Sequence, residues 1–151
     1  MQTNKILESD VSILDEQNNV IEEFDLFDEW TDKYEYLIDL GKKLPEFPEE
    51  YRRDEFKLKG CQSQVWLVGK MVEGRLVFQA ISDAAIVSGL IALLLRIYSN
   101  RSPKEILASD LSCLNKIGLE THLSPTRKNG LSSMLEAILN RAQLELQGNE
   151  N

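Results

Sequence analysis

The sequence has only two cysteines and fewer basic than acidic residues, and each shortage excludes a class of protein. The cysteines, Cys61 and Cys113, are too few for a disulfide scaffold, so we expect a protein of the reducing cytoplasm. With 17 basic and 25 acidic residues, the net charge is -8. Nucleic acid is therefore not the expected partner, because its phosphates require a basic surface.

Long apolar runs are also missing. The most apolar segment, residues 84–95, contains Ser88 and Gly89, and a membrane span needs about 20 apolar residues. No apolar segment follows Lys5, so the sequence predicts no secretion signal. Hydrophobic residues make up 42% of 151 positions, which suffices for the core of one domain. We expect a single cytoplasmic domain without a membrane span.

The acidic charge is concentrated at the beginning of the chain. Residues 1–30 hold nine acidic residues and one basic residue, Lys5. We interpret residues 1–19 as an acidic and partly flexible N-terminal extension, residues 20–147 as one domain and residues 148–151 as a C-terminal tail. The acidic segment is either a solvated helix face or a surface that steers a partner.

Hydrophobic periodicity and turn residues predict an α+β domain. The predicted helices cover residues 20–27, 30–41 and 84–98, a short segment from Pro103, residues 110–116 before a stop at Gly118, and the chain from Pro125 onward. The predicted strands cover residues 55–59, 64–68 and 75–81, the last two joined by a Glu73-Gly74 turn. A small antiparallel sheet of this kind has to pack against several helices to bury one face.

One local sequence has the composition of a reactive site: Gly-Cys-Gln-Ser-Gln-Val-Trp at residues 60–66. Cys61 lies between two predicted strands, and Gly60 permits the positive φ of a sharp turn beneath the thiol. A thiol at such a tip can be presented to another protein. Spacing alone leaves a packed, inert cysteine open as the alternative. We expect Cys113 to be buried and inert, and Trp66 to lie in the core.

Four blocks of the sequence resemble the SufE family. Residues 34–45 are similar to its aromatic helix followed by Gly-x-x-Leu-Pro, and residues 60–66 resemble its cysteine signature. Residues 82–91 are similar to Ser-Asp-Ala-x-Ile-Val-x-Gly-Leu, and residues 122–131 to His-Leu-(Ser/Thr)-Pro-(Ser/Thr)-Arg-x-x-Gly-Leu. The blocks follow the order of the family and cover roughly residues 20–143.

The resemblance implies a SufE/IscU-like fold and a sulfur acceptor that works beside a SufS- or CsdA-like cysteine desulfurase in iron–sulfur cluster assembly. Cys61 then takes the persulfide sulfur of the desulfurase and passes it to a SufBCD-type scaffold, which stimulates the desulfurase. In the family, the cysteine loop tucks its thiol into an apolar hollow and flips out on docking. The implied protein is a transpersulfuration partner rather than a stand-alone enzyme, and a monomer or weak dimer. It binds neither metal nor cofactor, because pyridoxal phosphate belongs to the desulfurase.

The same blocks supply supporting candidates. Gln62, Ser63 and Gln64 shape the loop and line the surface shown to partners, while Gly60 lets the backbone turn beneath the thiol. Arg127 stabilises an anionic sulfur, docks the desulfurase or, as an arginine at the start of a helix, ties down a loop. His122 is either a proton shuttle for Cys61 or a hydrogen-bonded loop residue. Asp83 is either a reactive group or, with Ser82, the N-cap of the helix that follows.

Two other functions stay open. In a Cys/His hydrolase, Cys61 is the nucleophile and His122 the base, with an Asn or Asp to orient it. In a metal or cluster scaffold of the IscU type, Cys61, Cys113 and His122 are ligands together with a carboxylate such as Asp83. The scarcity of cysteines counts against the scaffold. IscU-type proteins are thought to share the SufE fold, so the fold alone does not separate scaffold from carrier.

Overall fold

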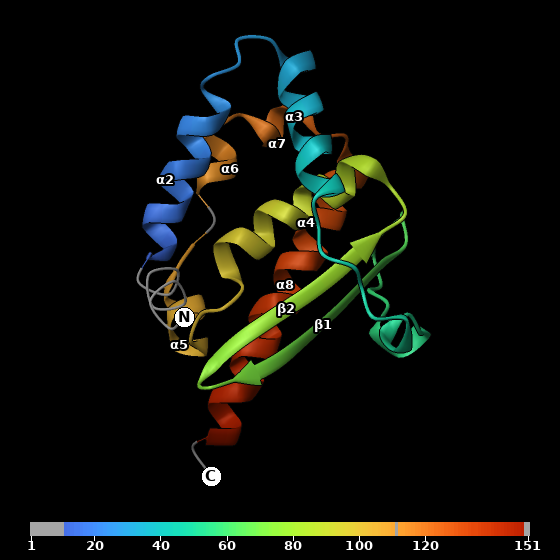
Figure 1. Ribbon diagram of the computed structural model, residues 1–151, viewed down its shortest axis with the longest axis vertical. Helices are drawn as coiled ribbons and strands as arrows, with labels where there is room; N and C mark the ends of the chain where they lie inside the picture. The colour runs from blue at the N-terminus through green and yellow to red at the C-terminus, as the bar shows by residue number, and fades with distance from the viewer. Residues whose placement is uncertain (1–10, 111, 150–151) are drawn as a thin grey trace.

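The computed structural model describes residues 11–110 and 112–149. Its helices are α2 (Ile13–Phe24), α3 (Trp30–Lys42), α4 (Ala85–Tyr98), α5 (Pro103–Ala108), α6 (Cys113–Lys116), α7 (Leu119–His122) and α8 (Pro125–Asn149). Its strands are β1 (Val65–Val72) and β2 (Arg75–Ser82), and two short 3-10 helices cover Glu49–Tyr51 and Asp54–Phe56. The two strands form an antiparallel hairpin among the helices (Figure 1), so the prediction of an α+β fold is confirmed.

The hairpin forms where the sequence predicts it. Val72 pairs with Arg75, so the turn consists of Glu73 and Gly74 alone. Both have positive φ, 51° and 82°, as a type I′ turn requires. This tight turn fixes the register of the two strands. The far end of the hairpin, where Val65 is paired, therefore lies directly beside the cysteine loop.

Helix α4 lies at the centre of the core, and most of its residues are buried. Helix α3 crosses it at a pair of glycines. A Cβ on Gly41 would lie 2.6 Å from Gly89 N, and a Cβ on Gly89 would lie 2.6 Å from Leu37 Cγ. No other residue type allows the two backbones to approach this closely. The glycine pair therefore determines how α3 packs on α4.

Helix α8 runs behind the hairpin (Figure 1). Ser124 starts it by accepting a hydrogen bond from Arg127 N at 3.3 Å, with Pro125 as the first helical residue. Its buried side chains form one stripe: Leu131, Met134, Ile138 and Ala142. Towards its other end, Arg141 Nη2 donates to the Gly69 carbonyl oxygen at 3.2 Å. This hydrogen bond ties α8 to β1, and the first turns of α8 lie beside the cysteine loop.

The strand predicted over residues 55–59 is wrong. The 3-10 helix Asp54–Phe56 occupies its beginning, and a single bridge between Lys57 and Trp66 follows. The chain turns away at Gly60, which has positive φ, before a regular ladder can form. The segment therefore closes the cysteine loop without adding a third strand.

Trp66 was expected in the core, and this prediction is also wrong. Strand alternation turns Val65 to the core and Trp66 to the opposite face, where it is only half-buried. The Arg52 guanidinium lies 5.3 Å from the ring centre of Trp66, and the Lys57 ammonium lies 5.8 Å from it. The indole thus lies within cation–π distance of two basic side chains, on the half-exposed face of β1.

Helix α2 crosses the boundary predicted at residue 19. Ile13 and Gln17 are buried, and Gln17 Oε1 accepts a hydrogen bond from Cys113 N at 2.9 Å. Residues 13–19 therefore pack on the domain and are held to α6. Residues 1–10 of the predicted extension and the last two residues of the predicted tail lie outside the described part of the chain.

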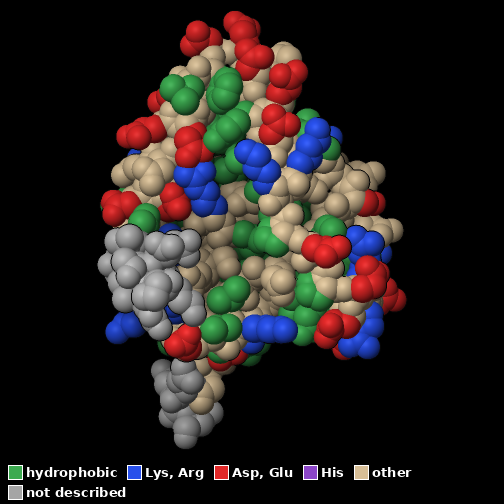
Figure 2. Space-filling view, in the orientation of Figure 1, with side chains coloured by type: hydrophobic (Ala, Val, Ile, Leu, Met, Phe, Trp, Pro, Cys, Tyr) green, Lys and Arg blue, Asp and Glu red, His purple; other side chains and the backbone are tan. Residues whose placement is uncertain are grey.

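The surface shows where the acidic residues gather. Acidic side chains cluster at the end of the molecule where α2 meets α3 (Figure 2). The exposed acidic residues there are Asp25, Asp28, Glu29 and Asp32. Across residues 11–110 and 112–149, no helix combines the length and the apolar character needed to cross a membrane.

Candidate functional site

The loop of residues 59–63 rises from a fixed base. Leu58 N donates to the Val65 carbonyl oxygen at 2.8 Å. Gln64 N donates to Asp83 Oδ1 at 3.1 Å, and Asp83 N donates to the Gln64 carbonyl oxygen at 3.3 Å. The base is therefore tied to the beginning of β1 and to the residue that follows β2.

The prediction of Asp83 as a helix N-cap is wrong. Helix α4 begins at Ala85, its N-cap residue is Ala84, and no side chain caps it. The carboxylate of Asp83 instead accepts from Gln64 N, because the hairpin register brings that amide within reach. Ser82 Oγ accepts from Ala84 N at 3.2 Å. Asp83 therefore holds the base of the cysteine loop rather than the helix.

The tip of the loop contacts α8. Gly60 has a φ of 86°, as expected from the sequence, and a Cβ there would lie 2.8 Å from Ser133 Oγ. Cys61 Sγ donates to the Gly130 carbonyl oxygen across 3.9 Å. Gly60 is thus required both by the backbone conformation and by the close approach to the helix.

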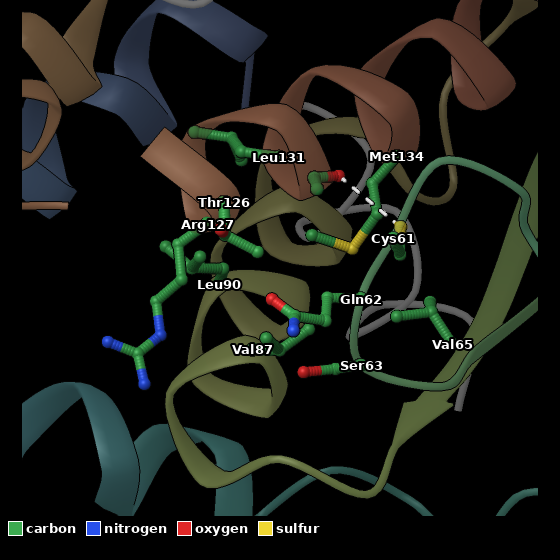
Figure 3. A pocket seen from close by; sticks show the side chains of 11 residues that line it. Cys61, Gln62, Ser63, Val65, Val87, Leu90, Thr126, Arg127, Leu131 and Met134 are labelled. Atoms are coloured by element: carbon green, nitrogen blue, oxygen red, sulfur yellow. Dashed lines mark hydrogen bonds between the residues drawn. The ribbon is translucent and has the colours of Figure 1, made fainter. Parts of the chain in front are cut away.

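Cys61 faces a small hollow between the loop, α4 and α8 (Figure 3). Apolar side chains form most of its lining: Val65, Val87, Leu90, Leu131 and Met134. The remaining side chains are Gln62, Ser63, Thr126 and Arg127. The volume of the hollow that the centre of a water molecule can occupy is about 20 Å³. A volume of about 10–15 Å³, measured in the same way, is enough to hold one water. The hollow therefore has room for one more heavy atom beside the sulfur.

The environment of Cys61 favours the neutral thiol. Burial raises the pKa of the Cys61 thiol, and the nearby Ser133 hydroxyl offsets part of that rise. Arg127 is the one charged residue of the lining, and its guanidinium extends away from the sulfur (Figure 3). Because the thiolate is the nucleophile, Cys61 is a weak nucleophile in this buried position.

Three of the supporting residues predicted from the sequence line this hollow: Gln62, Ser63 and Arg127. His122 is not among the lining residues. Its ring stacks on Trp30 with the ring centres 3.8 Å apart, and its Nδ1 lies 3.0 Å from the Gly118 carbonyl oxygen. Tyr34 donates its hydroxyl proton to the His122 carbonyl oxygen. These contacts hold His122 against α3.

Cys113 belongs to the core, as predicted. It is fully buried on α6, and burial raises its pKa to about 11. Its backbone N–H is bound by Gln17, so its contacts serve helix packing. Within the described ranges, the His, Cys, Asp and Glu side chains form no group of three that could hold a metal ion.

Sequence reasoning missed the residues of α8 that meet the cysteine. Gly130, Ser133 and Met134 are separated by three and four positions, so they share one face of the helix. This spacing was visible in the sequence. The sequence does not show that this face lies against Cys61, which is 69 positions away from Gly130.

Comparison with known proteins identifies relatives of the chain. The SufE family model, described as an Fe-S metabolism associated domain, matches residues 18–142. An uncharacterized SufE-like protein of Rhizobium meliloti is 47% identical over 131 residues, which are 83% of this chain and 94% of that protein. An uncharacterized SufE-like protein of Rhizobium etli is 44% identical over 132 residues, which are 84% of this chain and 89% of that protein.

A solved structure has the same fold. It is the solution structure of a hypothetical protein from Thermus thermophilus, which superimposes with a TM-score of 0.72. The match covers 87% of this chain and 96% of the other, at 19% sequence identity. At that identity, the likeness is evidence of the fold alone.

Proposed function

This chain belongs to the SufE family, and on that premise we propose that it accepts persulfide sulfur from a cysteine desulfurase on Cys61. The family and the names of the relatives support a role in iron–sulfur metabolism. One observation carries the proposal further: Cys61 is a free, half-buried cysteine at the tip of a loop, facing a hollow with room for one more atom. A thiol held in this way can be shown to a partner and shielded between encounters.

The proposed reaction is a thiol exchange without net oxidation. The Cys61 thiol loses its proton, and the thiolate attacks the outer sulfur of a persulfide on the desulfurase. The S–S bond of that persulfide breaks as a new S–S bond to Cys61 forms, and the desulfurase cysteine leaves as a thiolate. The same exchange then passes the outer sulfur to a thiol of a SufBCD-type scaffold. We expect the desulfurase to turn over faster, because it is relieved of its persulfide.

The raised pKa of Cys61 supports a step in which the loop tip turns outward before the attack. The thiol is a weak nucleophile while burial keeps it neutral. Its hydrogen bond to the Gly130 carbonyl oxygen is long, at 3.9 Å. The base of the loop is held by Gln64 and Asp83. We infer that residues 59–63 move on docking while the base stays in place.

Arg127 fits a docking role better than a role in stabilising the resting sulfur. It is exposed on the first turn of α8 and borders the hollow, yet its guanidinium extends away from Cys61 (Figure 3). A guanidinium in that position can pair with a carboxylate of the desulfurase. Gln62 is exposed next to the cysteine and belongs to the same presented surface.

In the proposed reaction, the chain and the desulfurase supply different groups. Pyridoxal phosphate belongs to the desulfurase, and this chain supplies a thiol and a docking surface as a monomer or weak dimer. Exchange through a free thiol suits the cytoplasm, where cysteines stay reduced. The chain then acts as a carrier and activator rather than as a stand-alone enzyme.

Intact-mass spectrometry tests the proposal directly. The protein is mixed with a cysteine desulfurase from the same organism and with cysteine, in the absence of reductant. We expect the wild type to gain the mass of one or more sulfur atoms, mapped to Cys61. The Cys61→Ser variant should gain none, and Cys113→Ser is the matched control that should load as the wild type does.

Failure of the wild type to gain sulfur, or equal loading of Cys61→Ser, would contradict the proposal. Metal analysis of the purified protein addresses the alternative of an IscU-type scaffold. Metal or cluster bound in stoichiometric amount, and lost in Cys61→Ser, would favour that alternative.

A further inference from the structure

Gly130 lies inside a long helix, although glycine destabilises the interior of a helix relative to alanine. Its backbone is helical, so it does not need the positive φ that Gly60 has. It also does not permit a close crossing of two backbones, as Gly41 does, where an added Cβ would lie 2.6 Å from a backbone nitrogen. The two reasons that explain other glycines of this chain therefore do not explain Gly130.

A side chain on Gly130 would meet the reactive sulfur. Within residues 11–110 and 112–149, and apart from neighbours in α8, the one atom within 4 Å of an added Cβ is Cys61 Sγ, at 3.8 Å. This is an ordinary contact distance, so alanine at position 130 would touch the thiol without displacing it. The Gly130 carbonyl oxygen also accepts from this sulfur, across 3.9 Å (dashed line in Figure 3).

The absent side chain leaves room on one side of the sulfur. Gly130 borders the hollow with its backbone alone, whereas the apolar side chains of α4 and α8 that line it are Val87, Leu90, Leu131 and Met134. The centre of a water molecule can occupy about 20 Å³ of this hollow, which is enough for one heavy atom. A methyl group on residue 130 is itself one heavy atom and would take up that room.

We propose that Gly130 is a specificity-determining residue of the sulfur-transfer site: the outer sulfur of a Cys61 persulfide takes the space that a side chain at position 130 would fill. The identity of the added atom rests on the proposed function. The outer sulfur replaces the thiol proton and lies about 2 Å from Sγ. Turned towards Gly130, it would overlap a Cβ that stands 3.8 Å from Sγ. Alanine would thus admit the thiol to the hollow and reject the persulfide.

The shelter has a chemical purpose. An exposed outer sulfur is open to attack by any free thiol, which takes the sulfur and leaves Cys61 as a thiolate. A persulfide that fits in the hollow is protected from this loss between loading and delivery. Gly130 therefore gives up helix stability for room in which the carrier keeps its sulfur.

Gly130→Ala tests the proposal, because it should affect only one of the two forms of Cys61. The persulfide is made with inorganic polysulfide: the Cys61 thiolate bonds to one sulfur of the polysulfide, which leaves shorter by one atom. Iodoacetamide then alkylates the thiol or the persulfide, and intact mass distinguishes the two products. Cys113 is fully buried, and peptide mapping assigns each product to Cys61.

We expect the thiol of Gly130→Ala to react at the wild-type rate, because the Cβ meets it at a contact distance. The persulfide of the same variant should react at least about fivefold faster than that of the wild type, which corresponds to about 1 kcal/mol for an overfilled site. Equal acceleration of both forms would mean that Gly130 only spaces the loop from the helix. Unchanged rates for both forms would mean that the outer sulfur does not use this space. Either result overturns the proposal.

Gly148→Ala is the matched control in the same helix. A Cβ on Gly148 would meet no atom of the described chain within 4 Å, so both forms of Cys61 should react there as in the wild type. Urea unfolding compares the reduced proteins, and Gly130→Ala should be at least as stable as the wild type, since alanine favours a helix. A loss of stability would show that the Cβ does not fit beside the thiol and would overturn the proposal.

The test is independent of sulfur delivery by the desulfurase, because the persulfide is made chemically. A desulfurase that fails to load Cys61 would contradict the proposed function and leave the alkylation rates as they are. Conversely, loading by the desulfurase together with equal persulfide rates in Gly130→Ala and the wild type would contradict the role of Gly130 alone.

Discussion

Replacing Gly60 by alanine tests how the loop tip is held against α8. Alanine at a φ of 86° is strained by about 1 kcal/mol or more. Its Cβ would also lie 2.8 Å from Ser133 Oγ, closer than packed atoms come. Both penalties apply to the tucked loop, whereas a loop turned outward is free to adopt another φ. The substitution should therefore move the tip outward without unfolding the domain.

The size of the effect follows from these two terms. A strain of about 1 kcal/mol changes a population ratio about fivefold, and the overlap adds to it where the helix cannot yield. We expect iodoacetamide to alkylate Cys61 at least about fivefold faster in Gly60→Ala at neutral pH. Relief of burial, which raises the pKa in the wild type, acts in the same direction. Alkylation is followed by intact mass, and global stability by urea unfolding.

Gly74→Ala is the matched control for Gly60→Ala. Gly74 has a similar φ of 82°, and a Cβ there would meet no atom within 4 Å. Its turn is part of the hairpin and cannot relax without unpairing the strands. We expect a loss of about 1 kcal/mol in the free energy of unfolding and no change in the alkylation of Cys61. The reasoning is refuted if Gly60→Ala loses the same stability as Gly74→Ala and reacts no faster than the wild type.

Three further predictions concern the core and the second thiol. Gly89→Ala should lower the free energy of unfolding by about 3 kcal/mol, because its Cβ would lie 2.6 Å from Leu37 Cγ; a loss below about 1 kcal/mol in urea unfolding contradicts this. Arg96 Nη1 donates to Glu23 at 2.7 Å, and this hydrogen bonding lowers the pKa of the Glu23 carboxyl. The stability that this pair contributes is present at neutral pH and is lost as the pH falls through the lowered pKa of Glu23. Glu23→Gln should therefore lower the free energy of unfolding by about 1 kcal/mol at neutral pH and by little in strong acid. Equal losses at the two pH values would contradict this prediction. Ellman's reagent should find one reactive thiol in the folded protein and two in urea, since Cys113 is buried with a pKa of about 11; two thiols in the folded state would show that α6 opens.

The parts of the fold that sequence reasoning predicted well have local causes. The Glu73-Gly74 turn needs only two residues with positive φ, and α5 starts as predicted because Ser102 Oγ accepts from Glu105 N three residues later. The same local rule failed at Asp83. A carboxylate before an apolar helix is a good N-cap by propensity, but the hairpin offered it the amide of Gln64 instead. Tertiary placement decided between two nearby donors.

In the candidate site too, the residues with local causes were predicted and those with tertiary causes were missed. Gly60 and Cys61 were predicted because their loop and motif are contiguous in the sequence. Gly130 and Ser133 were missed because their positions beside Cys61 and Gly60 depend on where α8 packs in the fold. His122 was a candidate because an imidazole can carry protons, but in the structure its ring stacks on Trp30. A rare residue type is therefore a weaker guide to this site than the helix face that the cysteine meets.

A sulfur carrier has to hold its thiol in place and also release it. In this loop, the contacts that hold the base differ from the contacts that hold the tip. Three hydrogen bonds fix the base through Leu58, Gln64 and Asp83. The tip is held by one long contact from Cys61 Sγ to the Gly130 carbonyl oxygen, worth at most about 1 kcal/mol net. A partner that binds with a micromolar Kd gains about 8 kcal/mol, so turning the tip outward uses a small part of that energy. Moving the base would disrupt the start of β1 as well, so we expect the proposed opening motion to be confined to the residues around Cys61.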